Sequence, residues 1–524
     1  MARLRRLSRI FGRGSWPGPR RKDGSGIRWR RLAGSGPEDD ARRRDSLVPG
    51  TAPGGRAFLR RPLLSRCCAC LFQGRCRCGI QCRGDRRAHG VALGRRRRGL
   101  DQPPRRASGS RRRGTLGAWP HGGMGGRGMS ATDSSILGND LLSNCVHCGF
   151  CLEVCPTYQL TGDENNSPRG RLRLWREEAE GKIPQDKWTD FYTSECVGCL
   201  ACEPACPANV PYGRILEETR HAHVAGRRWL PKPELRLAAA AVARKKFFDV
   251  ALLPARVLRK AGLLPHPLVF PGATPVLQST AAYAKELMAQ HRPDGPRVAL
   301  LTGCLMEALF REINFATVRV LIANNVQVVI PDGQGCCGAF QEHTGLDGVE
   351  KLRDVNRQAF DRLGVDCAVA NSAGCGLSLR KTLEGALPVR DVLGFLGEIG
   401  VKALPPRREK ARVYVDLPCH LVHGQRATIP ESVLDATGYR WQFAPCAKDC
   451  CGSGGIYNIQ KKENAREILA KKSAFLNDAE GDSVILATAN HVCMMQWNSA
   501  RWGGMVRRPF QVRHVIQLLD DGEL

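Results

Sequence analysis

Long apolar runs are missing from this sequence. No apolar stretch reaches about 18 residues, and the nearest candidate, Val250–Leu277, is broken by Arg256, Arg259 and several prolines. A membrane span is therefore excluded, and no apolar segment of the secretory-signal type follows Met1. We expect an intracellular, cytoplasmic protein, at most peripheral on the cytoplasmic face of the inner membrane. In that reducing environment the 24 cysteines indicate metal or redox chemistry before disulfides.

Motifs for substrate chemistry are missing as well. Gly452 and Gly454 begin a pattern like G-x-G-x-x-G, but Tyr457 stands where the third glycine is required. No Walker loop, H-E-x-x-H or nucleophile elbow occurs. No side chains stand out as an acid and base pair, so we predict no catalytic residues for substrate oxidation in this chain. A flavin or other catalytic centre is expected on another polypeptide.

Acidic residues are scarce only in the first quarter of the chain. Residues 1–128 contain 33 Lys and Arg against 7 Asp and Glu, and so carry most of the net charge of +30. The rest of the chain contains 47 basic and 43 acidic residues. An electrostatic attraction to nucleic acid or anionic lipid thus concerns only the first quarter, and we expect no nucleic-acid partner for the folded part.

The basic segment 1–128 has too few apolar residues to offset chain entropy, so we expect disorder. Lys22 is its only lysine among many arginines. Three interpretations are open: a transit peptide at Met1–Trp16, a nucleic-acid-binding arm, or translation extended upstream of a start at Met129, where the composition changes. We favour the last. Six cysteines here do not form paired C-x2-C zinc knuckles, namely Cys67, Cys68, Cys70, Cys76, Cys78 and Cys82.

Two cysteine runs share the spacing C-x2-C-x2-C-x3-C-P. This repeated pattern is typical of two [4Fe–4S] clusters of the bacterial ferredoxin type. Two zinc sites would need neither the third cysteine nor the proline. In ferredoxins three thiolates of a run bind one cluster, and the fourth reaches the other cluster. We therefore assign Cys145, Cys148, Cys151 and Cys206 to cluster 1, and Cys196, Cys199, Cys202 and Cys155 to cluster 2.

Residues around the two runs fit this interpretation. Gly149 and Gly198 allow backbone N–H groups to approach the sulfurs. The proline after each run, Pro156 or Pro207, fixes φ and redirects the chain. The runs are separated by about 40 residues, in which 171–180 and 187–194 read as helical. We therefore predict a mainly helical module that binds two clusters.

The C-terminal half contains a Cys-Cys-Gly motif twice. Each motif is preceded and followed by a single cysteine, and matching positions are offset by 114 to 118 residues. Two modules of about 115 residues therefore lie in tandem. Their cysteines are Cys304, Cys336, Cys337 and Cys375 in the first module, and Cys419, Cys450, Cys451 and Cys493 in the second.

Short apolar runs alternate with helical patterns in both modules. This alternation indicates parallel α/β units, in which ligands gather beyond the carboxyl ends of the strands. We expect the repeated cysteines at those ends. The predicted strands are Val298–Leu301, Val328–Ile330, Ala368–Ala370, Val413–Val415 and Val484–Ala487, and predicted helices include Glu312–Asn324 and Lys461–Ala474.

The role of the eight repeated cysteines stays open at this point. They are candidates for further iron–sulfur ligands or for redox and docking thiols, and the alternative is a buried structural pair. We interpret Cys367 and Cys446, which lie outside the repeat, as ordinary core thiols. His343 and His420 lie near the repeated cysteines, and we interpret both as structural.

Cys145–Arg171, the second cysteine run and the tandem Cys-Cys-Gly modules together resemble the iron–sulfur subunits of bacterial glycolate oxidases. The resemblance runs from about Ser143 to the C-terminus, and the string C-P-T-Y…G-D-E…P-R-G-R is more specific than the cysteines alone. It implies a hetero-oligomer with FAD-containing glycolate oxidase subunits. These partners would oxidise glycolate to glyoxylate, and also D-lactate to pyruvate. Electrons would pass through this chain towards the quinone pool or another non-oxygen acceptor.

Other iron–sulfur subunits share this layout, so alternatives remain. They serve anaerobic glycerol-3-phosphate dehydrogenase, lactate utilisation and heterodisulfide reductase. The fuller Cys-Cys-Gly pattern of that wider group ends in C-x-x-C. Ser372 and Asn490 stand here where its first cysteine would be, so each module lacks one thiol of the five-cysteine noncubane site.

The expected fold class is α+β and multidomain: an α-helical module with two [4Fe–4S] clusters, followed by two tandem α/β cysteine-rich modules. The expected boundaries are a basic extension at 1–128, the ferredoxin-type module at 129–225, a helical linker at 226–292, and the two cysteine-rich modules at 293–405 and 406–524.

Overall fold

The computed structural model describes residues 139–226, 233–261, 277–402 and 411–520. The predictions made for residues 1–128, including the six cysteines there and the start at Met129, lie outside the described residues. In the described part, no helix is long and apolar enough to cross a membrane.

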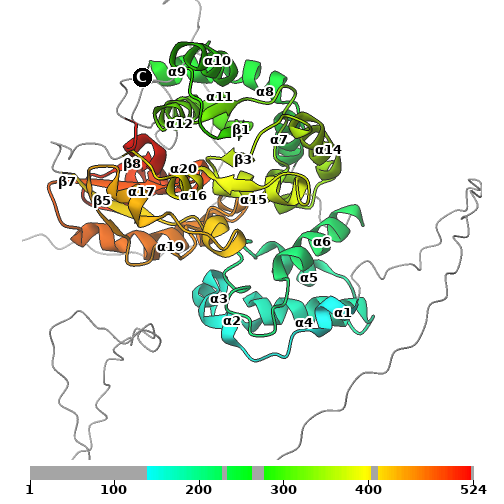
Figure 1. The fold of residues 1–524 in the computed structure, drawn as a ribbon. Coiled ribbons are helices and arrows are strands. Elements are labelled where there is room, and N and C mark those ends of the chain that lie inside the picture. The colour runs from blue at the N-terminus through cyan, green and yellow to red at the C-terminus, as the bar shows by residue number, and fades with distance from the viewer. Residues whose placement is uncertain (1–138, 227–232, 262–276, 403–410, 521–524) are drawn as a thin grey trace, which may run out of the picture. The chain divides into compact units, whose positions relative to one another are not determined.

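The first described module is helical and occupies residues 139–226; we call it the ferredoxin-type module (Figure 1). Both helices predicted between the cysteine runs are confirmed. Ser167 accepts a hydrogen bond from Gly170 N, and Pro168 is pre-organised for the first helical turn, so a helix begins there. Its helices are α1 Asn139–Ser143, α2 Phe150–Glu153, α3 Pro156–Thr161, η1 Glu164–Asn166, α4 Pro168–Ala179, α5 Lys187–Ser194 and α6 Tyr212–Ala225.

Two cysteines assigned to cluster 2 take part in the core of this module. Cys196 and Cys202 are buried beside Trp175, Tyr212 and Ile215. The apolar side chains come from α4 and α6, so these helices hold the second cysteine run against the rest of the module.

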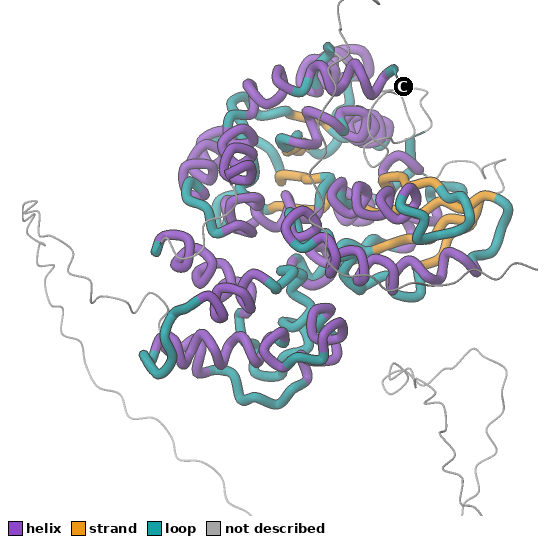
Figure 2. Tube along the Cα trace, turned by 180° about the vertical axis from the view of Figure 1, so that it is seen from behind, coloured by secondary structure: helices purple, strands orange, loops and turns teal. Residues whose placement is uncertain are grey.

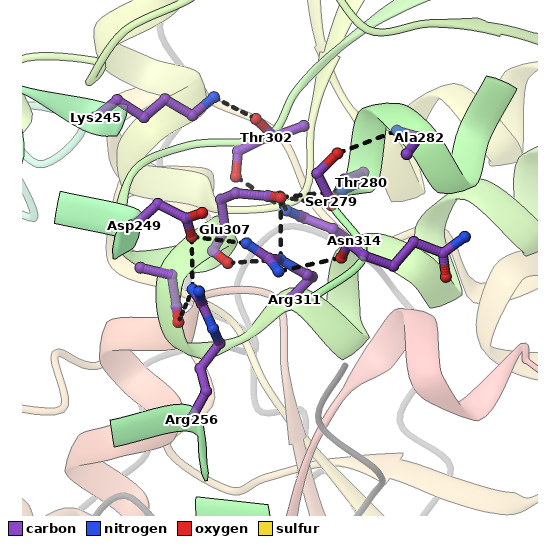
Figure 3. Close-up of polar contacts among 12 residues, drawn as sticks. Lys245, Asp249, Arg256, Ser279, Thr280, Ala282, Thr302, Glu307, Arg311 and Asn314 are labelled. Carbon is purple, nitrogen blue, oxygen red and sulfur yellow. Dashed lines mark hydrogen bonds and ion pairs between the residues drawn. The ribbon is translucent and has the colours of Figure 1, made fainter. Parts of the chain in front are cut away.

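Four helices, α7 Pro233–Ala243, α8 Lys245–Ala251, α9 Leu253–Lys260 and α10 Thr280–His291, connect this module to the sheets. A largely buried charged network attaches α8, α9 and α10 to the first sheet domain (Figure 3). Asp249 accepts hydrogen bonds from Arg256 at 2.5 Å and from Arg311 at 2.6 Å, and Arg311 also pairs with Glu307. Arg256 and Arg311 are buried while Asp249 is partly exposed, so these ion pairs help to hold α8 and α9 against the first sheet domain.

Residues 297–402 form the first cysteine-rich module, with a parallel four-stranded sheet in the order β2-β1-β3-β4. Its strands are β1 Arg297–Leu301, β2 Gln327–Val329, β3 Cys367–Ala370 and β4 Val389–Asp391. Its helices are α11 Leu305–Leu309, α12 Arg311–Ala323, α13 Ala339–Thr344, α14 Val349–Phe360, α15 Ala373–Thr382 and α16 Val392–Ile399.

Residues 411–520 form the second cysteine-rich module, whose parallel sheet has the equivalent order β6-β5-β7-β8. Its strands are β5 Ala411–Asp416, β6 Arg440–Phe443, β7 Ser483–Thr488 and β8 Gln511–His514. Its helices are η3 His420–Gly424, α17 Glu431–Asp435, α18 Tyr457–Gln460, α19 Lys462–Ser473, η4 Ala474–Asp478, α20 His491–Trp502 and η5 Val515–Leu518.

The two sheets and the helices that flank them confirm the predicted duplication and the α+β fold class (Figure 2). The central strands β1, β3, β5 and β7 are almost wholly buried, which explains why their sequences are mainly apolar. One core cluster contains side chains from both modules, such as Val369 of β3 and Ile485 of β7. The duplicated units therefore pack as one body.

Candidate electron-transfer centres

The four thiols assigned to cluster 1 surround a single cavity. Cys145, Cys148, Cys151 and Cys206 all line it, and Cys202 of the other set borders it as well. Burial raises the pKa of Cys151 to about 11, so its thiolate needs a positive partner such as iron. The residues present fit a [4Fe–4S] cluster at this position.

Local geometry in the first cysteine run depends on Gly149 and Arg169. Gly149 has φ of +87°, and a Cβ there would lie 2.7 Å from Arg169 Nη1. Arg169 donates to His147 O at 3.1 Å and pairs with Glu164, so it connects the run to η1. Arg169 of the P-R-G-R string therefore helps to hold the first cysteine run in place.

The thiols assigned to cluster 2 gather in the interior. Cys155, Cys196 and Cys202 are all more than nine-tenths buried. Burial raises the pKa of Cys202 well above its usual value, and the neighbouring charges of Cys199, Cys196 and Cys155 raise it further. Gly198, in the left-handed region as expected, donates from its backbone N to Cys196 Sγ at 3.4 Å.

Two buried arginines lie beside these thiols. Arg171 is fully buried, and it donates hydrogen bonds to Tyr192 O at 2.7 Å and to Thr157 Oγ1 at 3.2 Å. Its Nη1 has no hydrogen-bond partner in the described part of the chain. Arg220 donates to Cys196 O at 2.6 Å. Buried cations need compensating negative charge, which four thiolates around an iron–sulfur cluster provide. This site also fits a [4Fe–4S] cluster.

Within the described ranges, no three Cys, His, Asp or Glu side chains converge as ligands of a single metal ion, and the described cysteines are all free thiols.

The four repeated cysteines of the first module meet at the carboxyl ends of β1, β2 and β3, as predicted. Cys304 Sγ and Cys336 Sγ are 3.5 Å apart, and Cys337 interacts with Cys375. Hydrogen bonds from Cys304 and Cys337 lower the pKa of Cys336. Lys245 of α8 lies on the same side, where its Nζ donates to Thr302 Oγ1 at 2.6 Å (Figure 3).

The second module repeats this arrangement. Cys450 interacts with Cys419 and Cys451, and Cys451 interacts with Cys493. Gly338 and Gly452, the glycines of the two Cys-Cys-Gly motifs, both have positive φ (+89° and +81°), as a tight turn beside the sulfurs requires.

A buried lysine accompanies the second site as well. Lys472 of α19 pairs with Asp416 at 2.5 Å and lies near Cys451. Together, the half-buried Lys245 and the buried Lys472 place one ammonium group beside each set of four thiols.

Ser372 and Asn490, which replace a cysteine of the fuller pattern, face each other across the junction of the two modules. Ser372 Oγ donates to Asn490 Oδ1 at 2.9 Å and lies 3.1 Å from His491 Nδ1. Asn490 Nδ2 also donates to Cys493 Sγ at 3.3 Å. The two positions that lack a thiol therefore form a polar contact instead.

The ferredoxin-type module contacts the second thiol set directly. Cys199 Sγ interacts with Cys450, and this contact lowers the pKa of Cys199. Nearby, His420 Nε2 is hydrogen-bonded to Gly198 O at 3.0 Å, and Glu195 pairs with Lys461. The cluster 2 thiols thus adjoin the thiols of the second cysteine-rich module.

The two single histidines near the repeated cysteines lie against each other. His343 and His420 stack with ring centroids 5.1 Å apart, and burial lowers the pKa of both. Of the two thiols outside the repeat, Cys367 is buried as expected, whereas Cys446 is only half-buried and lines a surface cavity. The prediction of a core thiol was therefore wrong for Cys446, because the chain leaves β6 and returns to the surface there.

Sequence reasoning missed the buried cations Arg171, Arg220 and Lys472 and the half-buried Lys245. Only Arg171 carried a signal, since it ends the family-specific P-R-G-R string. The others lie on helices whose buried faces become evident only after folding.

Comparison with protein families supports the division seen in the fold. A family model described as a 4Fe-4S dicluster domain matches residues 141–210. A model described as a cysteine-rich domain matches twice, at residues 298–380 and 413–498. The predicted order of one two-cluster module and two cysteine-rich modules is confirmed.

Similar proteins occur in several bacteria. A Bacillus subtilis (strain 168) protein named probable glycolate oxidase iron-sulfur subunit is 33% identical over 397 residues, covering 68% of this chain and 88% of that protein. The glycolate oxidase iron-sulfur subunit of Escherichia coli (strain K12) is 29% identical over 418 residues, covering 75% and 97%. Lactate utilization protein A of Geobacillus kaustophilus is 22% identical over 249 residues, covering 43% and 98%.

Proposed function

Because this chain belongs to the family of glycolate oxidase iron–sulfur subunits, we propose that it relays electrons from a flavoprotein partner towards a non-oxygen acceptor such as the quinone pool. The partner, which binds FAD, oxidises glycolate to glyoxylate and D-lactate to pyruvate. The [4Fe–4S] clusters held by the eight ferredoxin-type cysteines would supply reversible one-electron storage. This chain is then the electron-transfer part of an oxidoreductase complex.

The contact between Cys199 and Cys450 carries this proposal. Cys148, a thiol assigned to cluster 1, is exposed. Cys202 is assigned to cluster 2 but also borders the cavity of cluster 1. Cys199, which is assigned to cluster 2 as well, adjoins Cys450. The thiols are therefore arranged in series from the surface at Cys148 to the second cysteine-rich module. A relay needs such a series, whereas an enzyme acting alone does not.

Three residues of the chain support the relay by electrostatics and geometry. Arg169 holds the first cysteine run in place, and Gly198 donates a backbone hydrogen bond to Cys196. Arg171 offsets the negative charge that each added electron brings into the interior.

The test starts from iron content. Anaerobically purified chain should contain about eight irons if only the two ferredoxin-type sites are loaded, and more if the cysteine-rich modules also hold clusters. Four or fewer irons after reconstitution, or stoichiometric zinc, would contradict two [4Fe–4S] clusters.

Electron transfer is then tested in the complex with its flavoprotein partners. Cys199→Ser should abolish electron transfer beyond the flavin and leave reduction of the flavin by glycolate intact. Cys367→Ala, a buried thiol outside both cysteine sets, is the matched control and should leave transfer unchanged.

A heterodisulfide-reductase-like activity of the isolated chain is the competing function. In that case Cys336, Cys337, Cys450 and Cys451 would act on a substrate directly. Disulfide reduction by the chain alone with a low-potential donor, lost in Cys337→Ser, would favour this alternative over the relay. Oxidation of glycolate by the chain alone, with a dye as electron acceptor, would contradict both the relay function and the disulfide-reductase function.

A further inference from the structure

A cavity of about 480 Å³ lies between the ferredoxin-type module and the second cysteine-rich module. Val154, Pro204 and Ile468 form its apolar wall. The polar and charged groups that line the rest are Glu153, Gln159, His423, Lys448, Asp449, Lys471 and Lys472. Cys450, the thiol that contacts Cys199, also lines it. The cavity therefore reaches the point where the two modules exchange electrons in the proposed relay.

Two other cavities in the described part have similar volumes, about 520 and 640 Å³, but both lie along 357–390 of the first module and contain no thiol. Of these three cavities, the one at Cys450 combines such a volume with a redox thiol. Small-molecule sites in proteins typically measure about 300–1,000 Å³, have mostly apolar walls and contain a few polar groups. The cavity at Cys450 lies in this volume range and combines an apolar wall with charged groups at its sides.

The wall chemistry narrows the class of ligand. A quinone has a flat apolar ring that suits Val154, Pro204 and Ile468, and carbonyl oxygens that accept hydrogen bonds. Lys471 is exposed and donates to Gln159 O at 3.4 Å, a weak contact that a carbonyl could replace. A nicotinamide dinucleotide would need a glycine-rich phosphate loop, which this sequence lacks.

We propose that this cavity is the binding site of a quinone headgroup, which accepts the electrons delivered through Cys199 and Cys450. This inference rests on the proposed relay function and names its acceptor site. The quinone takes up two electrons, which originate from the flavin of the partner subunit. It also takes up two protons from solvent, so both carbonyl groups become hydroxyl groups and the product leaves as the quinol.

The first experiment fills the cavity in the assembled complex. Gln159 is an exposed helical residue that lines the cavity, and Gln159→Trp should lower decylubiquinone reduction by glycolate at least ten-fold. Bleaching of the iron–sulfur absorbance by glycolate should stay unchanged. Gln358→Trp is the matched control, because Gln358 is likewise an exposed helical residue lining a cavity, of about 520 Å³, in the first module. Undiminished decylubiquinone reduction by Gln159→Trp would overturn the proposal.

The second experiment measures occupancy without turnover. Cys446 is half-buried in the wall of the cavity, so bound decylubiquinone, whose ring is fully substituted and inert to thiols, should slow its alkylation by N-ethylmaleimide. Gln159→Trp should remove the dependence of this rate on decylubiquinone, and Gln358→Trp should retain it. An alkylation rate independent of decylubiquinone in the unaltered complex would overturn the proposal and indicate an acceptor that docks elsewhere.

The two proposals fail differently. If glycolate does not bleach the iron–sulfur absorbance of the unaltered complex, the relay is contradicted, while the alkylation of Cys446 still decides whether the cavity binds the quinone.

Discussion

Ser372 and Asn490 occupy equivalent positions of the two cysteine-rich modules and hydrogen-bond to each other at 2.9 Å. Both are nine-tenths or more buried, and Ser372 also approaches His491. The loss of one thiol from each module is thus matched by a polar contact between the modules. This contact joins the carboxyl-end regions where both thiol sets lie.

Ser372→Ala should destabilise the junction of the modules. It leaves Asn490 Oδ1 without its buried donor, and such a loss costs about 1–3 kcal/mol. Thermal unfolding of the anaerobic chain should show a clear fall in melting temperature. Ser432→Ala, at an exposed helical serine, should leave the melting temperature nearly unchanged. Equal melting temperatures for the two variants would contradict a structural role for the contact.

Arg171→Met should lower the reduction potential of the adjoining centre. The guanidinium is fully buried beside Cys155 and Cys196, so its removal disfavours an added electron. An EPR-monitored redox titration measures the shift. Arg173 lies on the same helix but its side chain is 70% exposed, so Arg173→Met should leave the potential unchanged because water screens it. An equal shift of the reduction potential in both variants would contradict an effect of the Arg171 charge and indicate that the substitutions disturb the helix.

Gly454→Ala should separate the second cysteine run from the second cysteine-rich module. A Cβ at Gly454 would lie 2.6 Å from Val197 O and 2.8 Å from Tyr457 Cβ, so the contacting loop must shift. We expect slower electron transfer beyond cluster 2 and a lower melting temperature. Gly385→Ala controls for backbone strain, because Gly385 has φ of +76° and open space around its Cβ position. If both variants transfer electrons equally fast, the close approach at Val197 does not limit the relay.

Asp391 should make stability depend on pH. Burial raises its pKa from 3.8 to about 7, so the folded chain keeps this proton over a range where the unfolded chain has lost it. The contribution of Asp391 to stability is therefore largest below pH 4 and falls as the pH rises towards 7. Asp391→Asn retains an acceptor for Leu393 N and should remove this dependence.

Melting temperatures of wild type and Asp391→Asn, compared from pH 4 to 7, measure this effect. The variant should gain stability relative to wild type as the pH rises. Asp354→Asn, at an exposed carboxylate, should show no such gain. A constant difference between Asp391→Asn and wild type over this range would contradict the raised pKa.

The sequence by itself determined the architecture and the cysteine inventory. Spacing of four cysteines and a proline predicts the two-cluster module, since loop geometry around a cubane is local in the chain. The offset of 114 to 118 residues revealed the duplication, because repeats leave periodic cysteines and apolar strands in matching places. The predicted helix at 187–194 coincides with α5, whose start is fixed by the capping box of Asp186 and Thr189.

Only the tertiary structure decided which of these groups meet. Cys199 and Cys450 are far apart in the sequence, and so are Lys245 and Thr302 or Ser372 and Asn490. Such pairs follow from how whole modules pack, and packing depends on apolar area and shape summed over many side chains. The half-exposed position of Cys446 has the same origin. The local sequence pattern thus specifies each module and its thiols. Which residues of different modules touch depends on the burial of side chains that are far apart in the sequence, and no single segment encodes it.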